Sequence, residues 1–204
     1  MKKRIISFML LLCMLLTMLP ATGEVEVAAA ADPATTGKNA PIDFASSTSQ
    51  VCPVCGGTAK TWKPLPQITA NTVLAAGHYY VPEGGVSNTA QYTFDSNSVR
   101  CIHLNGNTLS STTRLFNVTN NARVNIFGSG NVTGNTGKKV SDGAIAYMST
   151  SRVYLYGGNH TVTYGTPYYI AGSSGNLYIY DGATISGGTV SNVAVTKCKA
   201  TMYG

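Results

Sequence analysis

Charged residues are scarce in this chain of 204 residues, and their shortage excludes several kinds of protein. Asp and Glu number eight in total, and Lys and Arg number fourteen. The basic residues are dispersed rather than gathered into a stripe, which argues against nucleic-acid binding. No stretch of a dozen residues carries apolar residues at helical spacing, so we expect the body of the chain to be almost entirely β-structure.

An apolar run long enough to span a bilayer is also missing. The run from Ile5 to Leu19 has 15 residues, whereas a spanning helix needs about 20. It follows Lys2-Lys3-Arg4 and precedes small residues that end at Ala31, which is the layout of a secretory signal peptide. We therefore predict that residues 1–31 are a cleaved signal peptide. The mature protein is then secreted or held at the cell surface, with no stable membrane span.

Residues 32–50 show no apolar periodicity. They are rich in Ala, Ser, Thr and Pro, so we expect a flexible linker. The remaining part of about 150 residues is enough for one domain with its own core.

The second half of the chain contains a repeat of about two dozen residues. Its segments align on a large residue that precedes a turn glycine, and successive anchors are 23, 29, 24 and 23 residues apart. The anchors are Leu104, Phe127, Tyr156, Tyr180 and Tyr203. Each period divides into three short strands joined by Gly, Asn or Asp turns. A repeat of this length is typical of a solenoid.

We therefore predict an all-β fold: a right-handed parallel β-helix of about four coils over residues 97–204, with three short strands per coil. Coils stacked about 4.8 Å apart would share inner columns of apolar side chains that no single coil can bury. A β-sandwich of short strands is the alternative. Residues 51–96 depart from the repeat and are expected to form an irregular N-terminal cap. The repeat stops in mid-coil at Gly204, so we expect a truncated chain. The predicted columns are Val124/Val153/Leu177/Ala200, Ile126/Leu155/Ile179/Met202 and the aromatic Phe127/Tyr156/Tyr180/Tyr203.

Three short motifs accompany the repeats: Cys52-Pro-Val-Cys55-Gly-Gly, Gly77-His-Tyr-Tyr and Cys101-Ile-His-Leu-Asn-Gly. With them and the recurring Tyr-Gly-Gly and Tyr-Asp-Gly turns, the chain resembles the secreted, repeat-bearing β-helix proteins of anaerobic Gram-positive bacteria. These are grouped with the pectate-lyase-like superfamily. The resemblance implies either a surface protein or a polysaccharide lyase or hydrolase.

Paired carboxylates, which acid–base chemistry on glycosides requires, are lacking. The repeat region offers only Asp142 and Asp181, with Asp95 just before it, and no two of them share a strand position. We therefore predict no catalytic residues. The alternative is a fragment of a polysaccharide lyase or hydrolase whose active coils lie beyond Gly204.

The cysteines outside the signal peptide suggest a metal site. Cys52 and Cys55 have the spacing of a zinc knuckle, and Cys101 and His103 would project from the same side of one strand, about 6–7 Å apart. If the cap folds over the first coil, these four groups form a Cys₃His zinc site. A disulfide in an oxidising exterior and unlinked thiols are the alternatives. Cys198, some three coils from Cys101, is expected to be a packing residue.

The remaining histidines and the tyrosines permit a structural and a functional interpretation. His78 and His160 are isolated and are interpreted as strand or turn residues. Exposed tyrosines on a flat β face can stack on sugar rings, and they can equally support neighbouring coils. The preferred function is a non-catalytic secreted or cell-surface module that binds extracellular polysaccharide or host glycan, or is adhesin-like. A structural spacer of a larger surface protein is a further alternative. The candidate glycan-binding residues are Tyr154, Tyr168, Tyr169 and Tyr178.

Overall fold

A computed structural model describes residues 38–39, 41–134, 143–163, 165–171, 174–187, 193–195 and 199–202. The regular elements in these ranges are all β-strands. No helix within them is long and apolar enough to cross a membrane. The expected signal peptide, Asp142, Cys198 and Tyr203 lie outside the described residues.

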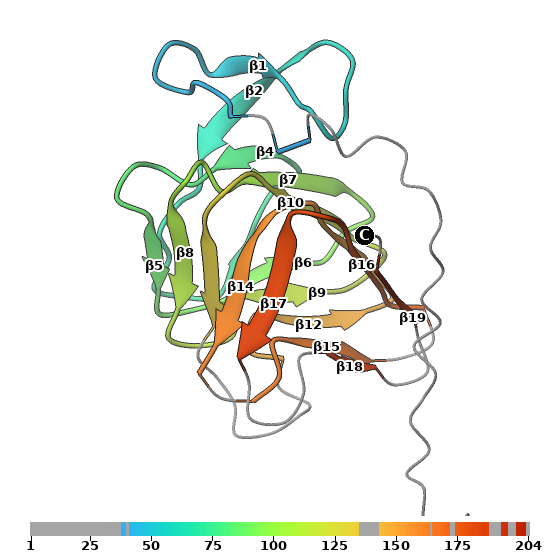
Figure 1. Cartoon of the computed structure of the whole chain (residues 1–204). Coiled ribbons are helices and arrows are strands. Elements are labelled where there is room, and N and C mark those ends of the chain that lie inside the picture. Colours follow the sequence, from blue (N-terminus) through green and yellow to red (C-terminus); the bar gives the residue numbers. More distant parts are fainter. Residues whose placement is uncertain are drawn as a thin grey trace, which may run out of the picture.

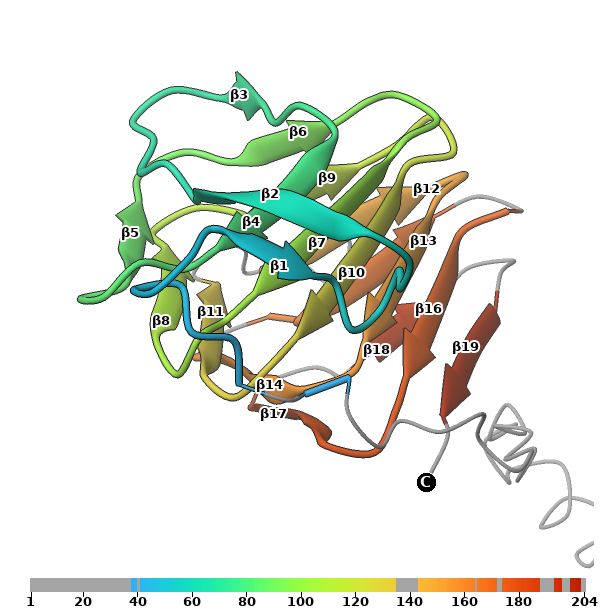
Figure 2. The ribbon, with the colours of Figure 1, turned by 90° about the horizontal axis from the view of Figure 1, so that it is seen from above.

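The strands form three sheets that wrap around one core (Figures 1 and 2). The eight-stranded sheet contains, in order, β1 (Ser49–Val51), β2 (Ala59–Pro64), β4 (Gly77–Tyr80), β7 (Val99–His103), β10 (Arg123–Phe127), β13 (Arg152–Leu155), β16 (Asn176–Ile179) and β19 (Lys199–Met202). The five-stranded sheet contains β17 (Ala183–Gly187), β14 (Gly158–Val162), β11 (Asn131–Gly134), β8 (Thr108–Ser111) and β5 (Val86–Asn88). The six-stranded sheet contains β18 (Val193–Val195), β15 (Tyr168–Ala171), β12 (Ala146–Ser149), β9 (Phe116–Val118), β6 (Tyr92–Phe94) and β3 (Thr72–Val73).

Strand pairing identifies the fold as a parallel β-helix. Each coil contributes one strand to each sheet, as β7, β8 and β9 do, and the next coil repeats the order with β10, β11 and β12. Among the described strands the single antiparallel pair is β1 with β2. The prediction of a parallel β-helix of about four coils with three short strands each is confirmed among the described strands, and the β-sandwich is excluded.

The register confirms the two predicted apolar columns. From β10 through β13 and β16 to β19, apolar residues of one strand face apolar residues of the next. The first inner column pairs Val124, Val153, Leu177 and Ala200, and the second pairs Ile126, Leu155, Ile179 and Met202. In the aromatic column, the rings of Tyr156 and Tyr180 stack with centroids 4.5 Å apart.

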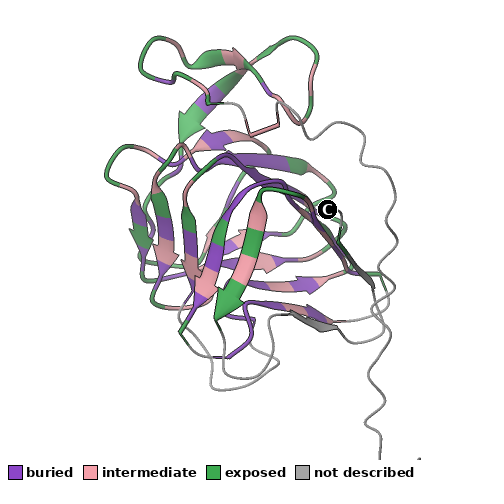
Figure 3. Ribbon diagram, viewed as in Figure 1, coloured by how far each residue is buried: buried purple, intermediate pink, exposed green. Residues whose placement is uncertain are grey.

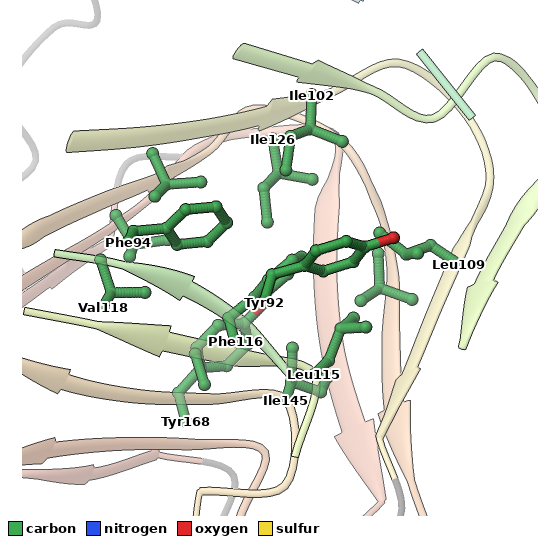
Figure 4. Close-up of a cluster of buried hydrophobic side chains, with 14 of the residues drawn as sticks. Tyr92, Phe94, Ile102, Leu109, Leu115, Phe116, Val118, Ile126, Ile145 and Tyr168 are labelled. Carbon is green, nitrogen blue, oxygen red and sulfur yellow. The ribbon is translucent and has the colours of Figure 1, made fainter. Parts of the chain in front are cut away.

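Inside the coils, the buried side chains form one continuous apolar core (Figure 4). Ile102 and Ile126 enter it from the eight-stranded sheet, Leu109 from the five-stranded sheet, and Phe94 and Phe116 from the six-stranded sheet. Figure 3 shows buried segments along the strands of the inner coils and exposed segments on β1 and β2, on β17 and on the turns.

The helix starts earlier than the expected boundary at residue 97. Strands β4, β5 and β6 pair in parallel with β7, β8 and β9, so residues 77–94 form a regular coil and not an irregular cap. Strand β2 also pairs in parallel with β4. The cap is therefore reduced to β1, β2 and the loop 52–58 between them, which we call the hairpin.

The segment expected to be a flexible linker is packed against the coils over its second half. Phe44 is 8% exposed, and its ring stacks on Tyr80 with centroids 4.4 Å apart. The Asn39 side chain accepts a hydrogen bond from the backbone N–H of Gly128 at 2.9 Å and donates one to the carbonyl of Tyr156. Residues 49 and 50 belong to β1.

Candidate metal centre

Two columns of side chains point away from the core on the eight-stranded sheet. Strand alternation sends Ile102 and Ile126 inward, and their neighbours outward. The first outer column contains Trp62, His78, Cys101, Asn125, Tyr154 and Tyr178. The second contains Tyr80, His103 and Phe127, and the stacked pair Tyr156 and Tyr180 continues it. The hairpin lies over the N-terminal part of both columns and forms a second buried cluster with it.

Four potential metal ligands meet beneath the hairpin. One ligand atom from each of Cys52, Cys55, His78 and Cys101 lies within 4.8 Å of the others. The Sγ atoms of Cys55 and Cys101 are 3.1 Å apart, which is longer than the disulfide bond of about 2.0 Å. All three cysteines are free thiols in the structure. We call these four residues the metal-ligand cluster.

The hairpin delivers its two cysteines through a tight turn. Gly56 and Gly57 adopt left-handed φ values of 65° and 77°, which glycine reaches without the penalty that other residues incur. The N–H of Gly56 donates to the carbonyl of Cys52 at 2.7 Å, and the N–H of Cys55 points at the Cys52 sulfur, 3.4 Å away. Backbone N–H groups directed at a sulfur favour its thiolate form. The Cys52-Pro-Val-Cys55-Gly-Gly motif therefore forms a compact turn that presents both sulfurs to the coils.

The other two ligands come from neighbouring coils. His78 on β4 and Cys101 on β7 are register partners in adjacent parallel strands. The ring of Trp62 packs against His78 with centroids 5.1 Å apart, and its N–H donates to the carbonyl of Gln50 at 3.0 Å. Trp62 thereby holds the histidine side chain and joins β2 to β1. The His78 Nε2 atom is buried and has no hydrogen-bond partner among the described residues.

Three of the four predicted ligands, Cys52, Cys55 and Cys101, come together, and the histidine beside them is His78 rather than the expected His103. His103 lies in the second outer column, where its ring packs edge-on against Phe127 and Phe44 at 5.1 and 5.4 Å. The physical reason is that side chains two residues apart on one strand are about 6–7 Å apart, while register partners in adjacent strands are about 4.8 Å apart. The nearest neighbour of a side chain on this sheet is therefore its register partner on the adjacent strand, not the next outward residue of its own strand.

The three thiols share their protons unevenly. The Cys101 and Cys55 thiols donate hydrogen bonds to Cys52 and hold the pKa of Cys52 far below its usual value. The pKa of Cys101 is raised, because it interacts with Cys52 and Cys55 and is desolvated by burial. The lowest pKa of the cluster therefore belongs to Cys52, while Cys55 and Cys101, whose pKa values are raised, hold their protons more tightly. A bound cation would displace those protons, as metals do when they bind thiols.

A second layer of polar groups supports Cys101. The Asn125 amide, fully buried one coil further on, donates to the Cys101 sulfur at 3.3 Å, and Arg123 donates to the Asn125 oxygen at 3.3 Å. The Cys101 hydrogen bond and the more distant Arg123 charge lower the pKa of Cys55, but its hydrogen bond with Cys52, burial and the Cys52 charge outweigh them and raise it overall. Supporting hydrogen bonds of this kind orient ligands and tune metal sites.

The geometry of the cluster fits a tetrahedral ion. With bonds of about 2.0–2.3 Å to sulfur and nitrogen, a tetrahedral zinc site has ligand atoms roughly 3.5–3.8 Å apart. The four ligand atoms here lie within 4.8 Å of one another, so small side-chain adjustments would complete the site. Cys52 and Cys101 are fully buried while Cys55 is exposed, so an ion could enter at the Cys55 side.

The tyrosines proposed as glycan-binding residues fall into three environments. Tyr154 and Tyr178 stack on each other with centroids 4.5 Å apart, and Arg123 covers the Tyr154 ring at 4.5 Å. Tyr169 is half-buried and stacks on Tyr147. Tyr168 is fully buried and points into the core. Tyr168 therefore cannot contact a glycan. Alternate side chains of β15 point into the core, and Tyr168 is one of them.

Comparison of the chain with protein-family models, with curated proteins and with solved structures gave no match in any of the three. The function is therefore inferred from the fold and the cluster.

Proposed function

We propose that this chain is a non-catalytic secreted or cell-surface β-helix module, carbohydrate-binding or adhesin-like, whose N-terminal hairpin is fastened to the coils by a structural zinc ion. The observation that carries the proposal is the metal-ligand cluster: three sulfurs and one imidazole from the hairpin and two coils converge within 4.8 Å. Four protein ligands leave no open position for a substrate, which is typical of structural and not catalytic zinc.

Zinc suits the cluster better than other common ions. Thiolates and imidazole are its preferred ligands, whereas calcium and magnesium take oxygen ligands. Three thiolates and one Zn²⁺ leave one net negative charge, and Arg123 lies close enough to offset it. Because the ligands come from segments up to 49 residues apart in sequence (Cys52 to Cys101), the ion would tie the hairpin to two coils at once.

The zinc proposal is tested by measuring metal content in a matched pair of histidine variants. The wild-type chain, purified after growth with zinc, is expected to contain one zinc per chain by elemental analysis. His78→Asn is expected to bind zinc at least about tenfold more weakly, while His103→Asn is expected to retain it. A wild-type chain that carries no zinc, or one in which mass spectrometry finds Cys55 joined to Cys101 in a disulfide, would overturn the zinc proposal.

The binding part of the proposal concerns the outer face of the later coils. Beyond the hairpin this face carries the half-buried tyrosines Tyr154 and Tyr178 in register, one per coil. A surface that repeats at coil spacing is suited to a ligand that itself repeats, such as an extracellular polysaccharide or a host glycan. We also propose that the chain belongs with the pectate-lyase-like superfamily, on the strength of its motifs and its parallel β-helix.

Carbohydrate binding is tested with the folded chain on immobilised neutral and acidic polysaccharides and on a host-glycan array. Retention on at least one of them is expected, with no release of sugar product. Product formation would favour the alternative of a lyase or hydrolase fragment. Absence of retention on every surface would favour the structural spacer.

A further inference from the structure

A polar groove crosses the coils at the start of the strands that carry the tyrosines. Its volume is about 470 Å³, and it is lined by Asn97, Asn121, Thr150, Arg152, Ser174 and Asn176. Four of these residues occupy the same turn in four successive coils, each two residues before β7, β10, β13 or β16. Arg152 and Asn176 are register partners at the first positions of β13 and β16. The groove therefore runs along the helix axis, with one lining side chain from each turn.

One turn residue in the groove has an unfavourable backbone. Thr150 has a left-handed φ of 50°, and its counterpart in the preceding coil, Asn121, has a φ of 59°. Asparagine tolerates this conformation, whereas a β-branched residue such as threonine rarely adopts it. Backbone strain of this kind is concentrated at functional sites. The strained threonine is thus an observation, separate from the shape of the groove, that points to a use for this surface.

The chemistry of the lining defines the class of ligand. Amides and hydroxyls both donate and accept hydrogen bonds, the Arg152 guanidinium donates them, and the groove offers little apolar surface. This combination matches the hydroxyl groups of a sugar and does not match a lipid or an apolar peptide. The coil spacing of about 4.8 Å is close to the length that one pyranose unit adds to an extended polysaccharide.

The neighbouring tyrosine column cannot supply the stacking surface by itself. The Tyr154 ring has Arg123 against it at 4.5 Å and Tyr178 against it at 4.5 Å. The Tyr154 ring is therefore already engaged in contacts within the protein. The open hydrogen-bonding positions lie beside the column, in the groove.

We propose that this groove binds an extended polysaccharide that lies parallel to the helix axis, with about one sugar unit per coil. The proposal deepens the carbohydrate-binding function proposed above and rests on it. It moves the contacts from the tyrosine rings to the turn residues. Arg152 pairs with a carboxylate where the polysaccharide is acidic, because guanidinium binds carboxylate in a two-pronged geometry.

The test compares a double substitution in the groove with a matched double substitution elsewhere on the surface. In each, one exposed Asn and one exposed basic residue are replaced by Ala. The groove variant is Asn97→Ala with Arg152→Ala, and the control is Asn131→Ala with Lys63→Ala, which lie on the five-stranded sheet and on the hairpin. All four side chains are exposed, so both variants are expected to melt at the wild-type temperature. Affinity is measured by electrophoresis in gels that contain galactomannan, a neutral polysaccharide, or polygalacturonate, an acidic one.

The groove variant is expected to bind at least tenfold more weakly than wild type to whichever polysaccharide the wild type binds, with the control unchanged. A loss confined to polygalacturonate also supports the groove and assigns the carboxylate contact to Arg152. If the wild type binds and the groove variant binds equally well, the groove is overturned while the carbohydrate-binding function stands. If the wild type binds neither polysaccharide, the groove proposal fails together with carbohydrate binding.

Discussion

Two regions of the molecule bury a histidine nitrogen, and they differ in whether the protein alone satisfies it. In the metal-ligand cluster, the buried Nε2 of His78 has three sulfurs around it and no hydrogen-bond partner among the described residues. In the later coils, His160 Nε2 lies 3.0 Å from the carbonyl of Gly157, and Nδ1 lies 2.7 Å from the hydroxyl of Tyr168. A buried polar atom without a partner is costly. The first histidine therefore has a nitrogen available to a ligand from outside the chain, whereas both nitrogens of the second are hydrogen-bonded within the protein.

The His160 pair also has a defined protonation state. A carbonyl oxygen only accepts, so Nε2 of His160 carries the proton and Nδ1 accepts from the Tyr168 hydroxyl. Desolvation by complete burial lowers the pKa of His160 to about 4 and raises that of Tyr168 well above its usual value. Both groups are neutral at physiological pH, so this region is a structural hydrogen-bond network.

Metal removal should produce the largest difference between the two regions. With zinc chelated, trypsin is expected to cleave after Lys60 in β2 at least about a hundredfold faster, because structural zinc contributes about 10 kcal/mol or more in small zinc domains. Arg152, in β13 of the later coils, serves as the internal control and is expected to remain protected. Mass spectrometry of the fragments measures both rates. If the hairpin resisted trypsin equally with and without chelator, no metal ion would be needed to hold it, and the two regions would not differ in this respect.

Acid should affect the His160 region in a pH window of its own. In the unfolded chain a histidine takes up a proton near its ordinary pKa of 6.5, while in the folded chain His160 does so only near about 4. The unfolded state therefore binds more protons between these values, and stability falls as the pH is lowered from 6.5 to 4. The expected loss from this group is roughly 3 kcal/mol, with no further loss below pH 4.

Urea unfolding of chelator-treated protein across this window measures that loss, because chelation removes the pH dependence of metal binding. The His160→Asn variant is the control, and its stability is expected to vary less with pH by the same roughly 3 kcal/mol. If the variant showed the same pH dependence as wild type, His160 would be accessible to protons in the folded state. The hydrogen-bond network around it would then not be closed to solvent.

The regular part of the fold could be predicted from the sequence because the repeat length gives the number of residues in each coil. The spacing of Leu104, Phe127, Tyr156 and Tyr180 fixes which strands stack, and strand alternation then fixes which side chains are inside. The first coil was assigned to the cap because its apolar residues are less regular. Yet Val81 precedes Leu104 by 23 residues, and His78 precedes Cys101 by the same interval. That interval is the signal that extends the helix to residue 77.

The site was harder to predict, because its fourth ligand is set by the stacking of coils. His103 stands two residues from Cys101 in sequence, while His78 stands one coil away and becomes its lateral neighbour. Spacing along the strand therefore favours His103 as the fourth ligand, whereas the repeat interval favours His78. The contacts of residues 39 and 44 with the coils could not be predicted either, since a single Asn or Phe in an irregular segment carries no periodic signal.

Removing one hydroxyl should distinguish the network around His160 from the tyrosine surface beside it. Tyr168→Phe leaves Nδ1 of His160 buried without its donor, and we expect a loss of about 1–3 kcal/mol in the free energy of unfolding. Tyr169→Phe, one residue further along β15 on the outer face, is expected to change it by less than about 0.5 kcal/mol. Urea unfolding at pH 7 compares the two. Similar effects of both substitutions would mean that the buried hydroxyl is not needed to satisfy His160.

The smallest expected effect concerns the buried amide behind the metal-ligand cluster. Asn125→Ala removes the hydrogen bond to the Cys101 sulfur, and we expect zinc affinity, measured by chelator competition, to fall about tenfold. Asn88→Ala is the matched control, because Asn88 is also fully buried but accepts a hydrogen bond from the backbone of Ile68, away from the cluster. Both variants should lose stability, and only the first should lose affinity. Undiminished zinc affinity in Asn125→Ala would imply that the Cys101 sulfur already has enough support without the amide. In that case the four ligands would hold the ion without support from the residues behind them, just as the His160 network depends only on the groups in direct contact with the histidine.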